Sequence, residues 1–210
     1  MYIATGMKTK IRRLLREDVD KMQLWSKHTE PLFFHYNFPK MSQGERDSWY
    51  KVKTVKWKKK SYAIENAEGH VIGYLLIRDI QWFRRESELG IVLDPQYMNQ
   101  GYGTDAIQAF LHFYFTEMNM QAIRLRTAKY NARAQRCYEK CGFKVVEEKD
   151  FAFEDQYAEI FYKETAPDIK KLFTFVDGVV MTRYTVMRMT KKDYSHTVNS
   201  LSTKIMLECE

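Results

Sequence analysis

Two short segments of this chain carry residue types at spacings suited to binding a phosphate-bearing ligand. In the first, Gly101 and Gly103 follow a strand-like run and come directly before a stretch of helical periodicity. Glycines let backbone N–H groups close on an anion without a Cβ in the way, and the following helix aims its partly positive N-terminus at the same point. The segment therefore predicts an anion-binding turn.

The second segment lies about thirty residues later and reads Asn131-Ala-Arg-Ala-Gln-Arg-Cys-Tyr-Glu-Lys-Cys-Gly-Phe143. Asn131 is a helix N-cap residue type, and Gly142 is a plausible C-terminal cap. The glycine turn at residues 101–103 lacks the Gly-Lys-Ser/Thr that would hold a triphosphate and its magnesium ion. A nucleoside triphosphate is therefore disfavoured as the ligand.

The elements that must position these segments alternate between strand and helix. Strand-like runs cover residues 8–15, 61–66, 70–79, 86–93, 121–129, 143–148 and 179–189. Helical stretches start at Arg16 and run through Trp25, from Ser42 to about Lys58, over 106–114 and over 132–140, with a capping box at Ser42 and Glu45. This alternation predicts an α/β fold with a mixed sheet.

The composition gives the chain an ample core, and its segments and cysteine use lead us to expect a cytoplasmic protein. Hydrophobic residues make up 45% and aromatic residues 15% of the 210 residues, which excludes disorder throughout. No apolar run reaches the ~18 residues of a membrane span, and the N-terminus lacks the apolar region of a signal peptide. Three cysteines form no disulfide framework, so we expect a reducing compartment and no membrane partner.

Much of the formal net charge of +7 is local. Six lysines gather around Trp49, Tyr50 and Trp57, at Lys51, Lys53, Lys56, Lys58, Lys59 and Lys60. We interpret them as a solvated helix face whose lysines cover aromatic surface. A nucleic acid is not the expected partner, because no recognised nucleic-acid motif accompanies the lysines.

The chain resembles the GNAT superfamily of N-acetyltransferases in the order and spacing of the glycine turn, Asn131, Tyr138 and Gly142-Phe143. Within that superfamily it is most similar to the ribosomal-protein N-terminal and polyamine acetyltransferase branch. The resemblance implies one domain over residues 8–190, with a mostly antiparallel central sheet of about six to seven strands flanked by helices. Residues 154–176 form an atypical insertion, and residues 191–210 form a tail. The insertion and the last strand suggest a homodimer.

The resemblance implies acetyl-CoA as the co-substrate, with no metal, and direct attack of a primary amine within a ternary complex. Glu88 is expected to take the amine proton, with Glu86 as its substitute, and Tyr138 to protonate the leaving thiolate. The expected coenzyme contacts are Ile91, Val92, Leu93, Met98, Asn99, Gln100, Gly101, Tyr102, Gly103, Thr104, Asn131, Ala134 and Cys137. Met98 departs from the usual Gln or Arg, so this turn relies on its backbone donors.

The acceptor remains open between a small-molecule amine and a protein N-terminus. We expect it to enter past an aromatic loop, against Trp25, Phe33, Phe34 and Tyr36, with His35 as a further contact. A polyamine is disfavoured because no acid cluster lies near this entrance. Two other functions stay open: a catalytically degenerate acyl-CoA-binding or regulatory module, indicated by Met98 and the tail, and a basic ribosome- or nucleic-acid-associated protein.

Cys137 and Cys141 lie four residues apart on one helix face, a spacing that also permits two metal ligands. No further cysteine or histidine is placed nearby to complete a zinc site. Packing at the coenzyme is the interpretation we adopt.

Overall fold

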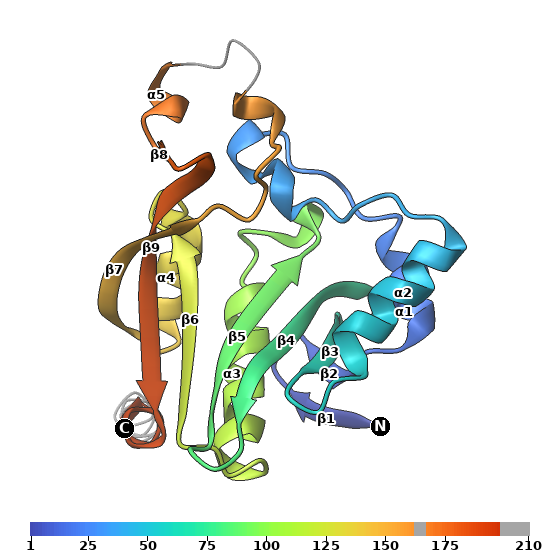
Figure 1. The fold of residues 1–210 in the computed structure, drawn as a ribbon. Helices are drawn as coiled ribbons and strands as arrows, with labels where there is room; N and C mark the ends of the chain where they lie inside the picture. The colour runs from blue at the N-terminus through green and yellow to red at the C-terminus, as the bar shows by residue number, and fades with distance from the viewer. Residues whose placement is uncertain (162–166, 198–210) are drawn as a thin grey trace.

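The computed structural model describes residues 1–161 and 167–197 of the chain. Within these residues one nine-stranded sheet has the order β1-β2-β3-β4-β5-β6-β9-β7, with β8 paired to β9 (Figure 1). The strands are β1 (Tyr2–Thr5), β2 (Lys10–Arg13), β3 (Lys60–Glu65), β4 (Val71–Gln81), β5 (Glu86–Leu93), β6 (Ala122–Ala128), β7 (Lys144–Ala152), β8 (Phe173–Val176) and β9 (Val179–Thr190).

The mixed, mostly antiparallel α/β sheet confirms the predicted fold class, but the expected six to seven strands were too few. β1 is only four residues long and precedes the run that predicted the first strand. β8 lies in the segment where aromatic and charged residues follow no clean period. Both strands form because β2 and β9 offer them a free edge to pair with.

Helices cover both faces of the sheet. α3 (Tyr102–Thr116) and α4 (Ala132–Lys140) lie on one face, and α1 (Arg16–Met22) and α2 (Gln43–Thr54) lie on the other (Figure 1). Strand β4 serves both, because its successive side chains point to opposite faces. Leu75 and Ile77 belong to the core under α3, while Tyr74 and Leu76 belong to the core under α1 and α2.

Both N-terminal helices end earlier than the sequence predicts. α1 stops at Met22 because the Trp25 indole N–H donates to the Val71 carbonyl at 2.8 Å, which draws the chain onto β4. α2 begins with the predicted capping box of Ser42 and Glu45 and stops at Thr54. None of the helices within the described residues is long and apolar enough to cross a membrane.

The described residues of the segment from 154 to 176 join Phe153, Val180 and the 3-10 helix η1 (Pro31–Tyr36) in a third apolar cluster. Its other short elements are η3 (Glu159–Phe161) and α5 (Pro167–Lys170). The buried members of this cluster are Leu32, Phe153, Ile160, Phe173 and Val180. The cluster therefore joins two parts of the chain that are far apart in sequence.

Residues 191–197, the start of the predicted tail, are helical. Tyr194 packs against the main core, and its hydroxyl lies 2.9 Å from His112 Nδ1. The remainder of the predicted tail lies outside the described residues.

Candidate active site

The strands β5 and β6 diverge and leave a gap in the middle of the sheet. They are the parallel pair, because the connection between them crosses over through α3. Their pairing covers only Glu86 to Glu88, after which β5 continues to Leu93 paired with β4 alone (Figure 1). The edge of β5 from Leu89 to Leu93 therefore faces the gap with backbone groups that a ligand can pair with.

A cavity of about 550 Å³ occupies this gap. It collects side chains from β4, β5, β6, the glycine turn, α4, η1, α2 and the segment after β7. Of the coenzyme contacts predicted from the sequence, the ones that line it are Ile91, Val92, Leu93, Met98, Asn99, Gly101, Gly103, Thr104, Asn131, Ala134 and Cys137.

The glycine turn has the backbone conformation that an anion cradle needs. Gly101 is the N-cap of α3 with φ +86°, and Asn99 has φ +60°. A Cβ at Gly103 would lie 3.2 Å from Leu93 Cδ1 and 3.7 Å from Cys137 Sγ, so a side chain there would intrude between β5 and α4. The turn thus leaves room for a phosphate group beside the N-terminus of a fifteen-residue helix.

The other two predicted coenzyme contacts, Gln100 and Tyr102, are not among the residues that line the cavity. The Gln100 carbonyl accepts from Lys8 Nζ at 2.9 Å, and the Gln100 side chain donates to the Gln96 carbonyl. The Tyr102 ring packs edge-on against Tyr97 at 5.6 Å. These side chains fix the turn from outside, and only their backbone N–H groups are available to an anion.

The hairpin between β1 and β2 also holds this turn, which the sequence did not reveal. The Asp105 carboxylate, in the first turn of α3, accepts from Met7 N at 2.8 Å, Lys8 N at 3.1 Å and Thr9 Oγ1 at 2.6 Å. A Cβ at Gly6 would lie 2.2 Å from this carboxylate. Because these donors occupy the acid, it is directed away from the cradle that would hold a phosphate.

Helix α4 contributes a cap and a row of positive charge. Asn131 Oδ1 accepts from Ala134 N at 3.2 Å, so the predicted capping role is present while Asn131 also lines the cavity. Arg133, Arg136 and Lys140 line the cavity from the same helix, and none of them has an ion-pair partner among the described residues. Uncompensated cations beside a glycine turn fit a ligand with several phosphates.

Tyr138 lines the cavity and is buried, with 8% of its surface exposed. Its ring packs edge-on against Phe143 at 6.0 Å, and its hydroxyl has no hydrogen-bond partner among the described residues. Burial, reinforced by Tyr36 and Cys137, raises the pKa of Tyr138 above its usual range. The phenol is therefore protonated near neutral pH and can donate its proton.

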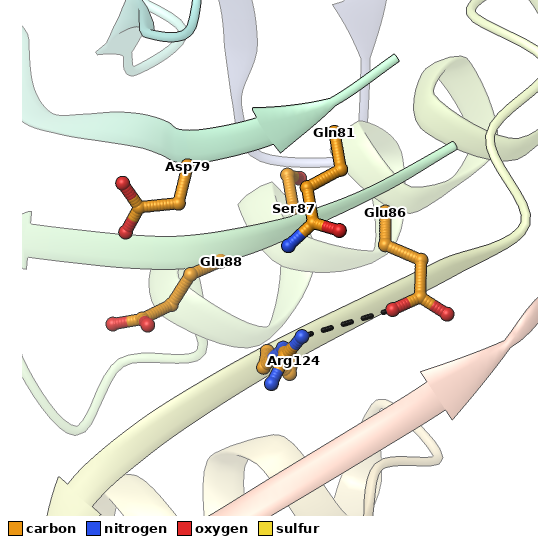
Figure 2. Close-up of a pocket in the computed structure, with 6 residues that line it drawn as sticks. All are labelled: Asp79, Gln81, Glu86, Ser87, Glu88 and Arg124. Atoms are coloured by element: carbon orange, nitrogen blue, oxygen red, sulfur yellow. Dashed lines mark ion pairs between the residues drawn. The ribbon is translucent and has the colours of Figure 1, made fainter. Parts of the chain in front are cut away.

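Both predicted bases are engaged with arginines on the opposite side of β5 from Leu89. Glu88 Oε1 accepts from both Nε and Nη2 of Arg78, and Arg126 Nε lies 3.6 Å away. Glu86 pairs with Arg188 at 2.8 Å and Arg124 at 3.7 Å. Figure 2 shows the two glutamates extending in different directions from the same strand into a smaller pocket of about 200 Å³. Neither glutamate lines the large cavity.

The carboxylate that does line the large cavity is Glu154, which sequence reasoning missed. It falls at the start of the segment without a clear period, so no pattern singled it out. Its charge acts on Tyr36, Tyr74 and Tyr138, which places it among the phenols of the cavity.

Of the four predicted acceptor contacts, the structure brings only Tyr36 to the cavity, together with His35. Trp25 is held by its bond to Val71 and stacks on Tyr74. Phe33 belongs to the third apolar cluster, and Phe34 is exposed to solvent. The cavity is lined in addition by residues that the sequence did not indicate, namely Phe38, Trp49, Lys53, Tyr74, Arg78 and Arg126. The end of the cavity that these residues share with Tyr36 is called the acceptor end below, after the predicted acceptor contact.

Comparison with known proteins agrees with this geometry. The model of the acetyltransferase (GNAT) domain matches residues 8–144. Spermidine N(1)-acetyltransferase of Vibrio cholerae is 24% identical over 163 residues, which cover 78% of this chain and 90% of the relative. The Escherichia coli K12 enzyme of the same name is 25% identical over 150 residues, which cover 70% and 80%.

Among solved structures, the crystal structure of spermidine N-acetyltransferase from Vibrio cholerae in complex with CoA and spermine superposes with a TM-score of 0.65. The match covers 89% of this chain and 97% of that chain at 20% identity, which shows a shared fold. With the family model matching well over half of the sequence, the chain belongs to the GNAT family and is an acetyl-CoA-dependent N-acetyltransferase.

Proposed function

We propose that the cavity between β5 and β6 binds acetyl-CoA and a primary amine together, and that the acetyl group passes directly to the amine. Acetyl-CoA supplies the thioester whose carbonyl carbon the amine attacks. The observation that carries the proposal is the convergence of the glycine turn, the open edge of β5 and Tyr138 on one cavity. The acceptor is a small-molecule amine or a protein N-terminus.

The backbone donors of residues 100–104 would bind the pyrophosphate, because Gly101 and Gly103 keep side chains away from that point. The phosphates would also meet Arg133, Arg136 and Lys140 on α4. The open backbone at Ile91 to Leu93 would pair with the pantetheine arm. An N–H of this edge can then polarise the thioester carbonyl.

The transfer forms a C–N bond, breaks the C–S bond and moves two protons. Tyr138 gives its phenolic proton to the departing sulfur, and burial keeps the phenol protonated until that step. The amine proton goes to Glu88 through water, as the resemblance implies, or to Glu154, which lines the cavity directly. The variants Glu88→Gln and Glu154→Gln decide between the two, because only substitution of the true base removes the base-dependent limb of the pH–rate profile.

The test of the function is release of free CoA thiol from acetyl-CoA on addition of an amine, with the acetylated amine identified by mass spectrometry. We expect thiol release that saturates in both substrates, and initial rates that fit a ternary-complex mechanism. Calorimetry that shows acetyl-CoA binding without thiol release for any amine would instead support the degenerate acyl-CoA-binding module.

Polyamines are a second acceptor class, favoured by the names of the two relatives. The charges around the cavity do not favour them, because Glu154 is the one carboxylate among the described residues that line it. Spermidine therefore belongs in the amine panel as the direct comparison.

A further inference from the structure

The acceptor end of the cavity carries three cations on three different elements. Lys53 comes from α2, Arg78 from β4 and Arg126 from β6, and all three line the cavity. They stand apart from Arg133, Arg136 and Lys140 of α4, which lie beside the glycine turn and account for phosphate binding. The acceptor end thus has positive charge that the coenzyme does not explain.

Lys53 was expected to belong to a solvated lysine cluster, but of these six lysines it is the one that lines the cavity. Its ammonium lies 5.2 Å from the centre of the Trp49 ring, and the Ser61 hydroxyl donates to the Lys53 carbonyl at 2.9 Å. These contacts orient the last turn of α2 so that Lys53 lines the cavity, whereas Lys51 on the same helix is exposed. Lys53 has no ion-pair partner among the described residues.

The surroundings of Lys53 leave its charge uncompensated. Burial, together with the like charges of Lys59 and Arg78, lowers the pKa of Lys53, while Glu154 acts in the opposite direction. Glu154 is exposed and forms no ion pair with any described residue. A half-buried cation repelled by its neighbours gains most from an anion that enters the cavity.

Arg78 and Arg126 supply the second half of the anion site. They share a single carboxylate, Glu88, which bonds Arg78 closely and lies 3.6 Å from Arg126. Arg126 also stacks over Phe151 at 5.1 Å, which fixes its guanidinium. Because two guanidiniums share one acid, N–H donors remain for a ligand.

We propose that the acceptor amine also carries an anionic group, a carboxylate being the class that fits, and that Lys53 and Arg78 bind this group while the amine is held near Glu154. The proposal rests on the proposed function and names its acceptor class. Trp49, Tyr74 and Phe38 form aromatic walls beside Lys53, so the carboxylate-bearing amine has room for a flat apolar body. A polycation would instead place its charges against Lys53 and Arg78.

The experiment compares acceptors that differ only in the anion. The probes are para-(aminomethyl)benzoate and its amide, whose amines are separated from the varied group by the ring, with spermidine as the polycation. We expect kcat/KM for the carboxylate to exceed that for the amide by about tenfold, the ratio that one hydrogen-bonded charge pair supplies. We expect spermidine to be the poorest of the three.

The variant Lys53→Met should bring the carboxylate-to-amide ratio close to one, because it removes the unpaired charge and keeps an apolar stem on Trp49. Lys51→Met is the matched control: it removes the same charge from the exposed face of α2 and should keep the ratio of the parent protein. Circular dichroism of both variants should show the spectrum of the parent protein, which serves as the control for folding.

Binding separates failure of this inference from failure of the proposed function. With CoA present, calorimetry should show the carboxylate bound about tenfold more tightly than the amide, whether or not turnover occurs. Equal affinities, equal kcat/KM values, or a ratio that survives Lys53→Met would overturn the anionic acceptor. Absence of thiol release for every amine, with the affinity difference intact, would overturn the proposed function and leave the anion site standing.

Discussion

The glycine turn makes a quantitative prediction through Gly101, whose φ of +86° lies in the left-handed region. A Cβ at this position would lie 3.6 Å from Lys8 Nζ, which is ordinary contact, so Gly101→Ala adds no steric clash. It adds the cost of holding an L-residue in the left-handed region, about 1–2 kcal/mol. The turn either stores this strain or relaxes and moves its N–H donors.

Gly69 provides the matched control because it has φ +80° in the β3–β4 hairpin, with nothing within 4 Å of an added Cβ. Gly69→Ala should therefore lower the free energy of unfolding by a similar ~1–2 kcal/mol without touching the cavity. Only Gly101→Ala should also weaken acetyl-CoA binding, by roughly tenfold if one charge-assisted hydrogen bond is lost.

Two measurements are needed for each variant. Denaturant unfolding of the ligand-free protein gives the change in stability, and calorimetric titration with acetyl-CoA gives Kd. The cradle is refuted if the two variants lose similar stability and both retain the acetyl-CoA affinity of the parent protein. Loss of affinity in Gly69→Ala would show instead that general destabilisation explains the effect.

Three further predictions concern groups around the cavity. The neighbouring Cys141 thiol and the Thr104 hydroxyl, 3.3 Å from Cys137 Sγ, lower the pKa of Cys137 below its usual value. Iodoacetamide at pH 7.5 should therefore modify Cys137, and saturating acetyl-CoA should block the reaction. Unchanged labelling in the presence of acetyl-CoA would place the ligand elsewhere. Burial lowers the pKa of His35 to about 4, so as the pH falls the unfolded chain binds this proton before the folded protein does. Up to about 3 kcal/mol of stability is therefore lost as pH falls from 6.5 to 4. His35→Phe should make the free energy of unfolding less dependent on pH over that range, and an unchanged pH dependence would exclude His35 as the cause. Gly6→Ala places a Cβ against Asp105 in the first turn of α3, so it should raise KM for acetyl-CoA more than KM for the amine. KM values equal to those of the parent protein would show that the N-terminal hairpin does not support the glycine turn.

Local signals were enough to identify residues that the fold brings together in one cavity. The glycine turn, the Asn131 cap and Tyr138 depend on backbone conformation and helix spacing within short segments, so their types and positions suffice to bring them to one cavity. The divergence of β5 from β6 is visible in the pairing that ends at Glu88.

The acceptor side depends on tertiary contacts that no local pattern encodes. In the sequence, Lys53 cannot be told apart from five neighbouring lysines. Its place at the cavity depends on contacts of the end of α2 with Trp49 and Ser61. Glu154 reaches the cavity because Phe153 before it is anchored in the third apolar cluster. The engagement of Glu88 by Arg78 requires the register of β4 on β5, where these two residues are direct partners.

The most direct test of the central claim is the turnover of Tyr138→Phe. The substitution removes only the hydroxyl, which has no hydrogen-bond partner among the described residues, so the fold and the ring packing on Phe143 should persist. We predict that kcat falls by about 10²- to 10⁴-fold, the contribution of general acid catalysis, while calorimetric Kd for acetyl-CoA stays within about twofold. A kcat equal to that of the parent protein would contradict proton donation by Tyr138 at this cavity.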